Sequence, residues 1–310
     1  MEIVLIIAFL GAMFMGVSIG ASSVPPAFAP VVGSSKGLRL ALIGGISAFA
    51  GALIQGQNVT NTIGSGILTG QIQVIQAAFI LVVASLLVMI SVLNDYPMPT
   101  AFTVTGAVIG SGFGFGNEII WSSTRFITLF WVLTPLAAFT LGYAFAHILR
   151  SALSKEGSEK VINALLLIAG CYVAYTAGAA SVGLAVGPLG GLGHPIIYLL
   201  IFGGVSILIG AWMFSPRIIH VISYDYSNIG PRRSIAALIA AGLIAQIGIQ
   251  LGVPVSFGLA IIPAVIGSGV AEGMENKNTR KIGFTILAWV AALFLAMLLT
   301  FALGVLWKFI

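Results

Sequence analysis

The feature that most constrains this chain is the absence of charge over long stretches. No Asp, Glu, Lys or Arg occurs between Glu2 and Lys36, between Arg39 and Asp95, between Lys160 and Arg217, or between Arg233 and Glu272. Each gap holds one or more runs of about 20 apolar residues, the length of a helix that crosses a bilayer. Only 7% of the residues are charged, whereas soluble domains carry about a quarter. The sequence therefore predicts an all-α integral membrane protein.

Several motifs occur twice in the same order. Ala-Val-Ile-Gly-Ser-Gly is found at residues 107–112 and again at 264–269, and a Gly-Ala motif begins at Gly20 and again at Gly178. The members of each pair are 157 or 158 residues apart, which a chance match does not explain. We predict an internal duplication with a first repeat over 1–150, a linker over 151–160 and a second repeat over 161–310.

Each predicted repeat contains five apolar segments. They are residues 3–19, 40–56, 72–93, 97–115 and 126–149 in the first repeat, and 161–178, 195–214, 234–252, 254–271 and 282–307 in the second. Because five is odd, consecutive repeats must face opposite ways if every segment crosses the membrane. Some segments could instead be re-entrant hairpins, which would change the number of crossings but need not change the sidedness.

The basic residues support this inverted topology. If the linker 151–160 is cytoplasmic, eleven of the thirteen Lys and Arg residues fall on the cytoplasmic side, and only Arg125 and Lys308 fall outside. This bias is the positive-inside rule. It explains the net charge of +5 without nucleic acid, which we do not expect as a partner. We expect a multi-pass protein of the cytoplasmic membrane, surrounded by lipid, with both termini outside.

Glycine and proline interrupt the apolar segments at four places. The first pair of interruptions is Gly20–Gly33 and Gly178–Gly193, and the second is Pro97–Thr105 and Pro254–Gly258. Transporters with inverted repeats bind substrates at the membrane midplane, where helices are broken. Free backbone N–H groups and helix N-termini at such breaks favour an anion. The alternative is close helix packing, which uses the same small residues in membranes, but clustered prolines at equivalent places favour a site.

The predicted substrate-binding residues come from these four motifs. They are Gly20, Ala21, Ser22, Ser23, Val24, Thr100, Thr103, Gly178, Ala179, Ala180, Ser181, Val182 and Ser256. The hydroxyl groups would contact the substrate directly, and the two Gly-Ala motifs would contribute backbone N–H groups.

Patterns typical of enzymes and metal sites are not found in the sequence. The three histidines, His147, His194 and His220, lie near the ends of apolar segments and lack the spacing of metal ligands. The acidic residues fall at or near the predicted membrane surfaces, whereas a proton pump keeps an acid inside the bilayer. We therefore expect neither an enzyme nor a bound cofactor or metal.

The paired motifs resemble those of the inorganic phosphate transporter family. That family carries a Gly-Ala-Asn-Asp-Val-Ala-Asn signature once per half, followed by Gly-Pro, and a later Pro-Val-Ser-Thr-Thr element. Gly178-Ala179, Val182 and Gly187-Pro188 match the signature, and Pro254-Val255-Ser256 matches the later element. The resemblance covers nearly the whole chain. It implies an inverted-repeat permease for a tetrahedral oxyanion, commonly a homodimer.

The departures from the family signature bear on the substrate. Where the family has Asn-Asp, this chain has Ser22-Ser23 and Ala180-Ser181, so the roles of the Asp residues in sodium coordination and phosphate binding cannot be carried over. The first motif and the run Gln57–Ile67 look more like the sulfate-permease branch. Sulfate is fully ionised at pH 7 and only accepts hydrogen bonds, whereas hydrogen phosphate has a proton that a carboxylate accepts. Hydroxyl donors without a carboxylate therefore favour sulfate.

Three functions remain open from the sequence. The first is a secondary-active sulfate permease with alternating access between two inverted halves. The second is phosphate transport with changed coupling, and the third is a passive anion channel or a membrane scaffold that transports nothing. The coupling ion, proton or sodium, also stays open, because carbonyl and hydroxyl oxygens could hold sodium without the signature Asp residues.

Overall fold

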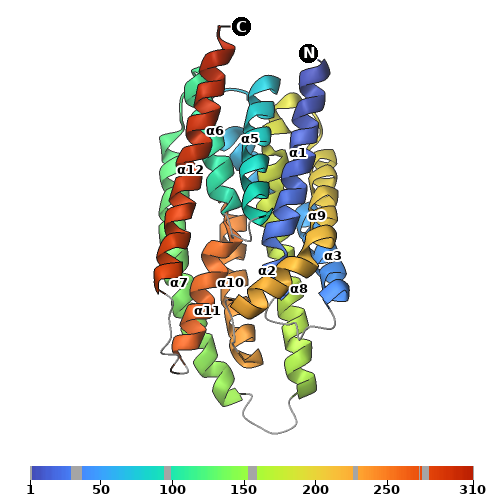
Figure 1. Ribbon diagram of the computed structural model, residues 1–310, viewed down its shortest axis with the longest axis vertical. Helices are drawn as coiled ribbons and strands as arrows, with labels where there is room; N and C mark the ends of the chain where they lie inside the picture. Colours follow the sequence, from blue (N-terminus) through green and yellow to red (C-terminus); the bar gives the residue numbers. More distant parts are fainter. Residues whose placement is uncertain are drawn as a thin grey trace.

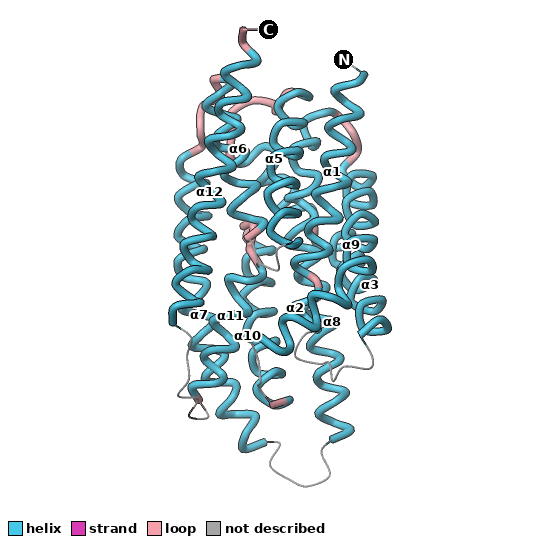
Figure 2. The backbone as a smooth tube through the Cα atoms, in the orientation of Figure 1, coloured by secondary structure: helices cyan, strands magenta, loops and turns pink. Residues whose placement is uncertain are grey.

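A computed structural model describes residues 2–28, 37–93, 99–152, 159–225, 230–271, 273 and 279–309, and these residues are almost entirely helical (Figures 1 and 2). The long helices are α1 (Glu2–Ser23), α3 (Gly37–Gln55), α5 (Val74–Leu93), α6 (Thr100–Phe115), α7 (Trp121–Ala152), α8 (Glu159–Val186), α9 (Ile196–Asp225), α10 (Pro231–Gln250), α11 (Phe257–Val270) and α12 (Thr279–Trp307). The short segments are α2 (Pro25–Phe28), α4 (Gln57–Asn61), the π-helix η2 (Thr62–Gly66) and the 3-10 helix η3 (Gly187–Leu192).

The helices form one elongated bundle with two distinct ends. Both chain termini lie at one end, which we call the terminal end (Figure 1). The end of α7 and the start of α8 lie at the opposite end, which we call the linker end. Seven of the described helices are long and apolar enough to cross a membrane. The predicted class, an all-α integral membrane protein, is confirmed.

Two helices, α6 and α11, begin inside the bundle (Figure 1). The α5–α6 pair enters from the terminal end and the α10–α11 pair from the linker end, and each pair turns back within the bundle. At 1.5 Å per residue, α6 and α11 are about 24 and 21 Å long, shorter than the ~30 Å hydrocarbon core. α6 and α11 are therefore re-entrant helices rather than simple spans, and their N-termini lie inside the bundle.

Close helix contacts recur at the spacing of the repeated motifs. A Cβ atom on Gly20 of α1 would collide with the carbonyl oxygen of Ile207 in α9. Likewise, a Cβ atom on Gly178 of α8 would collide with the carbonyl oxygen of Ala48 in α3. The first long helix of each half, α1 or α8, therefore packs against the second long helix of the other half, α9 or α3.

The Ala-Val-Ile-Gly-Ser-Gly motif makes a second reciprocal contact. Gly110 of α6 lies directly against the backbone of Met297 in α12, and Gly267 of α11 lies directly against the backbone of Phe139 in α7. Each re-entrant helix thus packs along the last helix of the opposite half. These contacts interleave the two halves, while the repeat boundaries at 150 and 161 stay a prediction.

Candidate functional site

Two uncapped helix N-termini lie inside the bundle. Pro99 precedes α6 with φ −78° and ψ 98°, and Ser256 precedes α11 with φ −78° and ψ 120°. Neither residue caps its helix through a side-chain hydrogen bond. Because the first N–H groups of a helix have no partner within it, each end offers backbone donors and a partial positive charge.

Trp131 of α7 connects these two helix ends. Its indole N–H donates a hydrogen bond to the carbonyl oxygen of Pro254, at 2.7 Å, in the turn before α11. Its ring stacks on Phe102 in the first turn of α6, with 4.0 Å between the ring centroids. The two proline-rich motifs of the sequence, one from each half, are therefore held close together by one side chain. Trp131 was not predicted as a site residue, because nothing in its local sequence sets it apart from a packing residue.

Three of the predicted hydroxyl groups are free. Thr100, Ser181 and Ser256 are at most 3% exposed, yet their hydroxyls make no hydrogen bond within the described residues. Other buried hydroxyls behave differently. Thr134 and Thr176, for example, donate to a carbonyl oxygen in the preceding helical turn at 2.7 and 2.9 Å. A hydroxyl without a protein partner is available to donate to a ligand, so these three groups are suited to hold one.

The other predicted hydroxyls are engaged locally. Thr103 donates to the carbonyl oxygen of Pro99 at 3.1 Å. Ser22 lies 3.3 Å from the carbonyl oxygen of Ile19, and its hydroxyl lies 3.4 Å from that of Ser23. These groups keep acceptor capacity and could exchange partners, but they are not free in this conformation.

The two Gly-Ala motifs themselves lie within helices, which corrects the expectation of free backbone N–H groups there, while a helix end follows each motif inside both predicted interruptions. α1 runs through Gly20 to Ser23, and α8 runs through Gly178 to Val186 before η3 begins. Their backbone N–H groups are therefore used by helical hydrogen bonds. The physical reason is that both glycines are points of closest approach between helices, where small residues serve packing in membranes. The expected N–H donors lie instead at the starts of α6 and α11.

The structure places the second Gly-Ala motif beside the α10–α11 turn. Ala179 and Ala180 form a buried cluster with Ile249, which lies near the end of α10. The first motif lies against α9 through Gly20 and contains the buried residues Ala21 and Val24. The second Gly-Ala motif and the two proline-rich motifs thus meet around the α10–α11 turn. The first Gly-Ala motif lies at the end of α1 (Figure 1).

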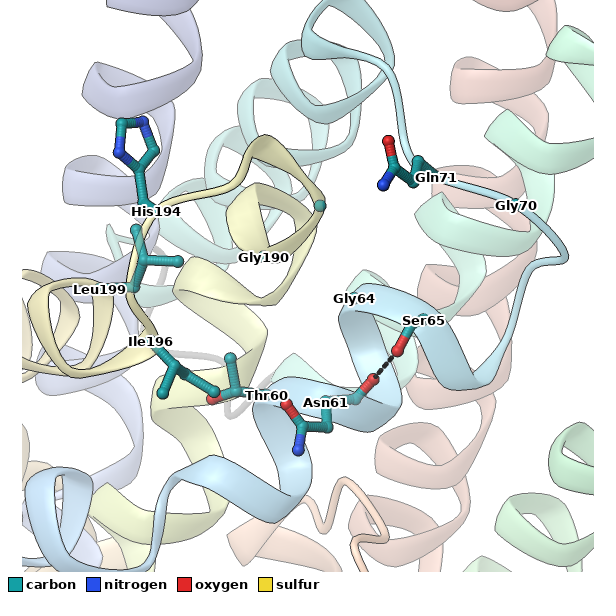
Figure 3. A pocket seen from close by; sticks show the side chains of 11 residues that line it. Thr60, Asn61, Gly64, Ser65, Gly70, Gln71, Gly190, His194, Ile196 and Leu199 are labelled. Carbon is teal, nitrogen blue, oxygen red and sulfur yellow. Dashed lines mark hydrogen bonds between the residues drawn. The ribbon is translucent and has the colours of Figure 1, made fainter.

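A cavity of about 320 Å³ lies between the first half's α4–η2 segment and the second half's η3 (Figure 3). It is lined by Thr60, Asn61, Gly64, Ser65, Gly70, Gln71, Gly190, Gly191, His194, Ile196 and Leu199. None of these residues was predicted as part of the site, although the run Gln57–Ile67 contributes to the resemblance to the sulfate-permease branch. The π-helix could not be read from the sequence, yet such helices are often found at functional sites.

Acidic residues within the described ranges are found at helix ends and in one turn of the sequence. Glu2 and Glu159 begin α1 and α8, Asp225 ends α9, and Glu118 lies between α6 and α7. The described part of the chain contains no group of three or more His, Cys, Asp or Glu residues placed to hold a metal ion. Hydroxyls, amides, indole N–H groups and helix ends are therefore among the described polar groups inside the bundle.

The sequence matches the model of the phosphate transporter family over residues 19–158 and again over 150–300. The chain belongs to this family. The predicted resemblance is confirmed, and the chain is a membrane transporter rather than an enzyme.

Similar proteins of this family differ in the oxyanion that they are named for. Over 96% of its length the chain is 27% identical to the sulfate permease CysP of Bacillus subtilis, 86% of which is covered. Over 97% of its length it is 25% identical to a putative phosphate permease of Methanocaldococcus jannaschii, 95% of which is covered. A solved structure described as the sodium-dependent phosphate transporter matches with a TM-score of 0.83 at 20% identity, covering 99% of both chains. The fold is therefore that of this transporter.

Proposed function

We propose that the protein is a secondary-active permease that moves a tetrahedral inorganic oxyanion across the membrane by alternating access, with sulfate favoured. One observation carries the proposal: the uncapped N-termini of α6 and α11 lie inside the bundle, joined through Trp131, with the free hydroxyls of Thr100 and Ser256 beside them. Backbone N–H groups and the helix dipole at such ends attract anions. Hydroxyl donors add directional hydrogen bonds to the oxyanion.

The preference for sulfate rests on the residues at the Gly-Ala motifs. Ser22-Ser23 and Ala180-Ser181 stand where the family signature has Asn-Asp, so these positions supply hydroxyls instead of a carboxylate. A dianion without a proton cannot donate to a carboxylate, whereas hydroxyl donors suit it. The likeness to the Bacillus subtilis sulfate permease supports the same choice.

Phosphate is the second candidate substrate. The family model that matches the chain is described as a phosphate transporter family, and the Methanocaldococcus jannaschii relative is named a putative phosphate permease. Hydroxyls and helix N-termini bind hydrogen phosphate as well as sulfate. Competition between the two anions distinguishes these candidates.

The same proposal includes an orientation in the cytoplasmic membrane. Arg150, Lys160, Arg232 and Arg233 lie in the last turn of α7, the first turn of α8 and the first turn of α10, all toward the linker end. The positive-inside rule therefore favours a cytoplasmic linker end and external termini. A homodimer and coupling to protons or sodium are proposed from the family resemblance.

The deciding experiment is uptake into proteoliposomes that contain the purified protein. Radiolabelled sulfate and phosphate are offered under imposed sodium and proton gradients, with unlabelled competitor in parallel samples. We expect sulfate uptake above its electrochemical equilibrium, inhibited more strongly by sulfate than by phosphate. Stronger inhibition by phosphate would make phosphate the substrate. Uptake that never exceeds equilibrium would indicate a channel, and background uptake of both anions would contradict the proposal.

A further inference from the structure

The cavity between α4–η2 and η3 is open at one side. Gln71 and His194 at the mouth are exposed, and on the α4–η2 side Thr60 and Gly64 are buried while Asn61 and Ser65 are exposed (Figure 3). The His194 ring lies 5.7 Å from the ring of Phe9, in the first half of α1. Because α1 starts at the terminal end, the mouth faces that end of the bundle.

A single layer of backbone separates the cavity from the predicted substrate motifs. A Cβ atom on Gly183, which directly follows Val182, would meet the backbone nitrogen of Thr60 at 2.5 Å. On the same α4–η2 segment, the Thr62 hydroxyl lies 2.9 Å from the Cβ position of Gly252, in the α10–α11 turn. The α4–η2 segment therefore lies between the cavity, the second Gly-Ala motif and the turn that leads into α11.

The lining chemistry suits an anion. The side-chain amides of Asn61 and Gln71 and the imidazole of His194 make no hydrogen bond within the described residues, so their N–H donors are available. The Ser65 hydroxyl donates to the carbonyl oxygen of Asn61 at 3.1 Å (Figure 3). All the polar side chains that line the cavity are amides, hydroxyls or the imidazole.

One glycine at the mouth, Gly190, is not required by close packing. A Cβ atom on Gly190 would have no heavy atom within 4 Å, in contrast to the glycines of the helix contacts described above. Replacement by alanine would be sterically free there, so close packing does not account for this glycine. It leaves the backbone of η3 open to the cavity, where a ligand can approach it.

We propose that this cavity is an anion-binding access chamber, in which a tetrahedral oxyanion binds before it passes the α4–η2 segment toward the helix ends of α6 and α11. The choice of oxyanion rests on the proposed function, but binding in the chamber does not require transport. The α4–η2 segment, with its π-helix, is then the barrier that must move to admit the anion.

The test is protection of an introduced cysteine from a hydrophilic maleimide. The single native cysteine, Cys171, is first replaced by alanine, and Gln71→Cys and Gln73→Cys are made separately in that background. Both glutamines are exposed in the same loop, but only Gln71 lines the cavity, so Gln73 is a matched control. Labelling rates are measured on purified protein in detergent with sodium sulfate, sodium phosphate or sodium chloride at equal ionic strength.

We expect sulfate or phosphate to slow the labelling of Gln71→Cys by about tenfold relative to chloride, with no change at Gln73→Cys, because a bound oxyanion blocks the mouth. Equal labelling rates of Gln71→Cys in all three salts would contradict oxyanion binding in the chamber. Equal protection at both positions would also overturn it, since that result reflects a general salt effect. These measurements need no transport, so they stand apart from the uptake experiment.

A second variant links the chamber to transport. Asn61→Asp places a carboxylate in the cavity, and we expect it to raise the oxyanion concentration for half-maximal uptake by about tenfold through like-charge repulsion. Gln73→Glu adds the same charge outside the cavity and should leave that concentration unchanged. An equal effect of both substitutions, or of neither, would contradict the chamber even if the wild-type protein transports sulfate.

Discussion

At the scale of single residues, the free hydroxyl of Ser181 is the most informative group in the site. Thr100 and Ser256 lie at helix starts, where no helical turn precedes them to accept a hydrogen bond. Ser181 lies well inside α8 and has a preceding turn, yet its hydroxyl makes no hydrogen bond within the described residues. Its position one residue before Val182 places it in the motif that meets the α10–α11 turn.

Replacing Ser181 by alanine should reduce oxyanion binding without unfolding the protein. A hydrogen bond to a charged group contributes about 1.5–3 kcal/mol, so we expect the half-saturating sulfate concentration to rise at least about tenfold. Thr176→Val, on the same helix, removes a hydroxyl that donates to the carbonyl oxygen of Val173 and should leave that concentration unchanged. The half-saturating sulfate concentration for uptake and the thermal unfolding temperature are measured for both variants. An equal effect of the two substitutions on uptake would show that Ser181 does not bind the substrate.

Residue identity allowed the hydroxyl donors to be predicted, but not the backbone around them. Pro25 and Pro26 end α1 soon after Ser23, as expected of residues that clash with a preceding helical turn. The predicted interruption over Gly178–Gly193 is found at Gly187, where α8 gives way to η3, whereas Gly178 stays inside α8 because the backbone of Ala48 lies against it. Proline is not a uniform signal of a helix end among the described residues, since Pro135 and Pro263 lie inside α7 and α11.

At the scale of helices, the repeated Ala-Val-Ile-Gly-Ser-Gly motif forms contact seams rather than a binding loop. Gly106, Gly110 and Gly114 of α6 lie in turn against Leu293, Met297 and Phe301 of α12, each pair one helical turn beyond the last. Glycines spaced by four residues let two parallel helices approach closely. The repeat was visible in the sequence, but its contact partners lie in the opposite half and could not be read from local pattern.

Substitution of Gly267 by alanine should destabilise the α7–α11 seam. The new methyl group would collide with the carbonyl oxygen of Phe139, and overpacking of this kind costs about 1–3 kcal/mol. We expect thermal unfolding of the purified protein several degrees below wild type. Gly283→Ala in α12 is the control, because no heavy atom lies within 4 Å of its Cβ position. Equal unfolding temperatures for the two variants would show that the seam tolerates the methyl group.

The bridge made by Trp131 should matter for transport more than for folding. Trp131→Phe keeps an aromatic ring against Phe102 but removes the hydrogen bond to Pro254. We expect slower oxyanion uptake, because the N-terminus of α11 loses the contact that holds it near that of α6. Trp212→Phe is matched to it, since the Trp212 indole donates to the carbonyl oxygen of Leu42, at 3.3 Å, between α9 and α3. Initial uptake rates that fall equally in both variants would argue against a special role for Trp131.

At the scale of the whole molecule, interleaving of the halves explains how a site forms from distant segments. α1 packs on α9, α3 on α8, α6 on α12 and α7 on α11, and each of these four most extensive helix contacts combines one helix from each side of the linker. Composition and charge predicted the membrane class, and internal repeats predicted two related halves. The pairing between halves follows from three-dimensional packing, and the sequence held no local signal for it.

Alternating access requires the two halves to move against each other, and one polar contact between them is suited to opening. The Gln246 side-chain amide on α10 donates to the Gln55 side-chain oxygen on α3 at 2.9 Å. The Gln246 oxygen is buried without a partner among the described residues. A buried acceptor that lacks a partner makes the contact between Gln55 and Gln246 less stable, as expected of a contact that separates during a transport cycle.

Cross-linking this contact should stop transport reversibly. With Cys171 replaced by alanine, Gln55→Cys and Gln246→Cys are joined by a short bis(methanethiosulfonate), which forms a disulfide with each thiol and releases methanesulfinate. We expect oxyanion uptake to fall to background and to return after the disulfides are reduced. Gln76→Cys with Asn117→Cys is the control, because their side chains are 3.1 Å apart but both lie in the first half. That cross-link leaves the two halves free to move, so uptake should persist. Full uptake after complete cross-linking of the first pair would exclude separation of the halves at this contact and would require a transport cycle in which α3 and α10 stay together.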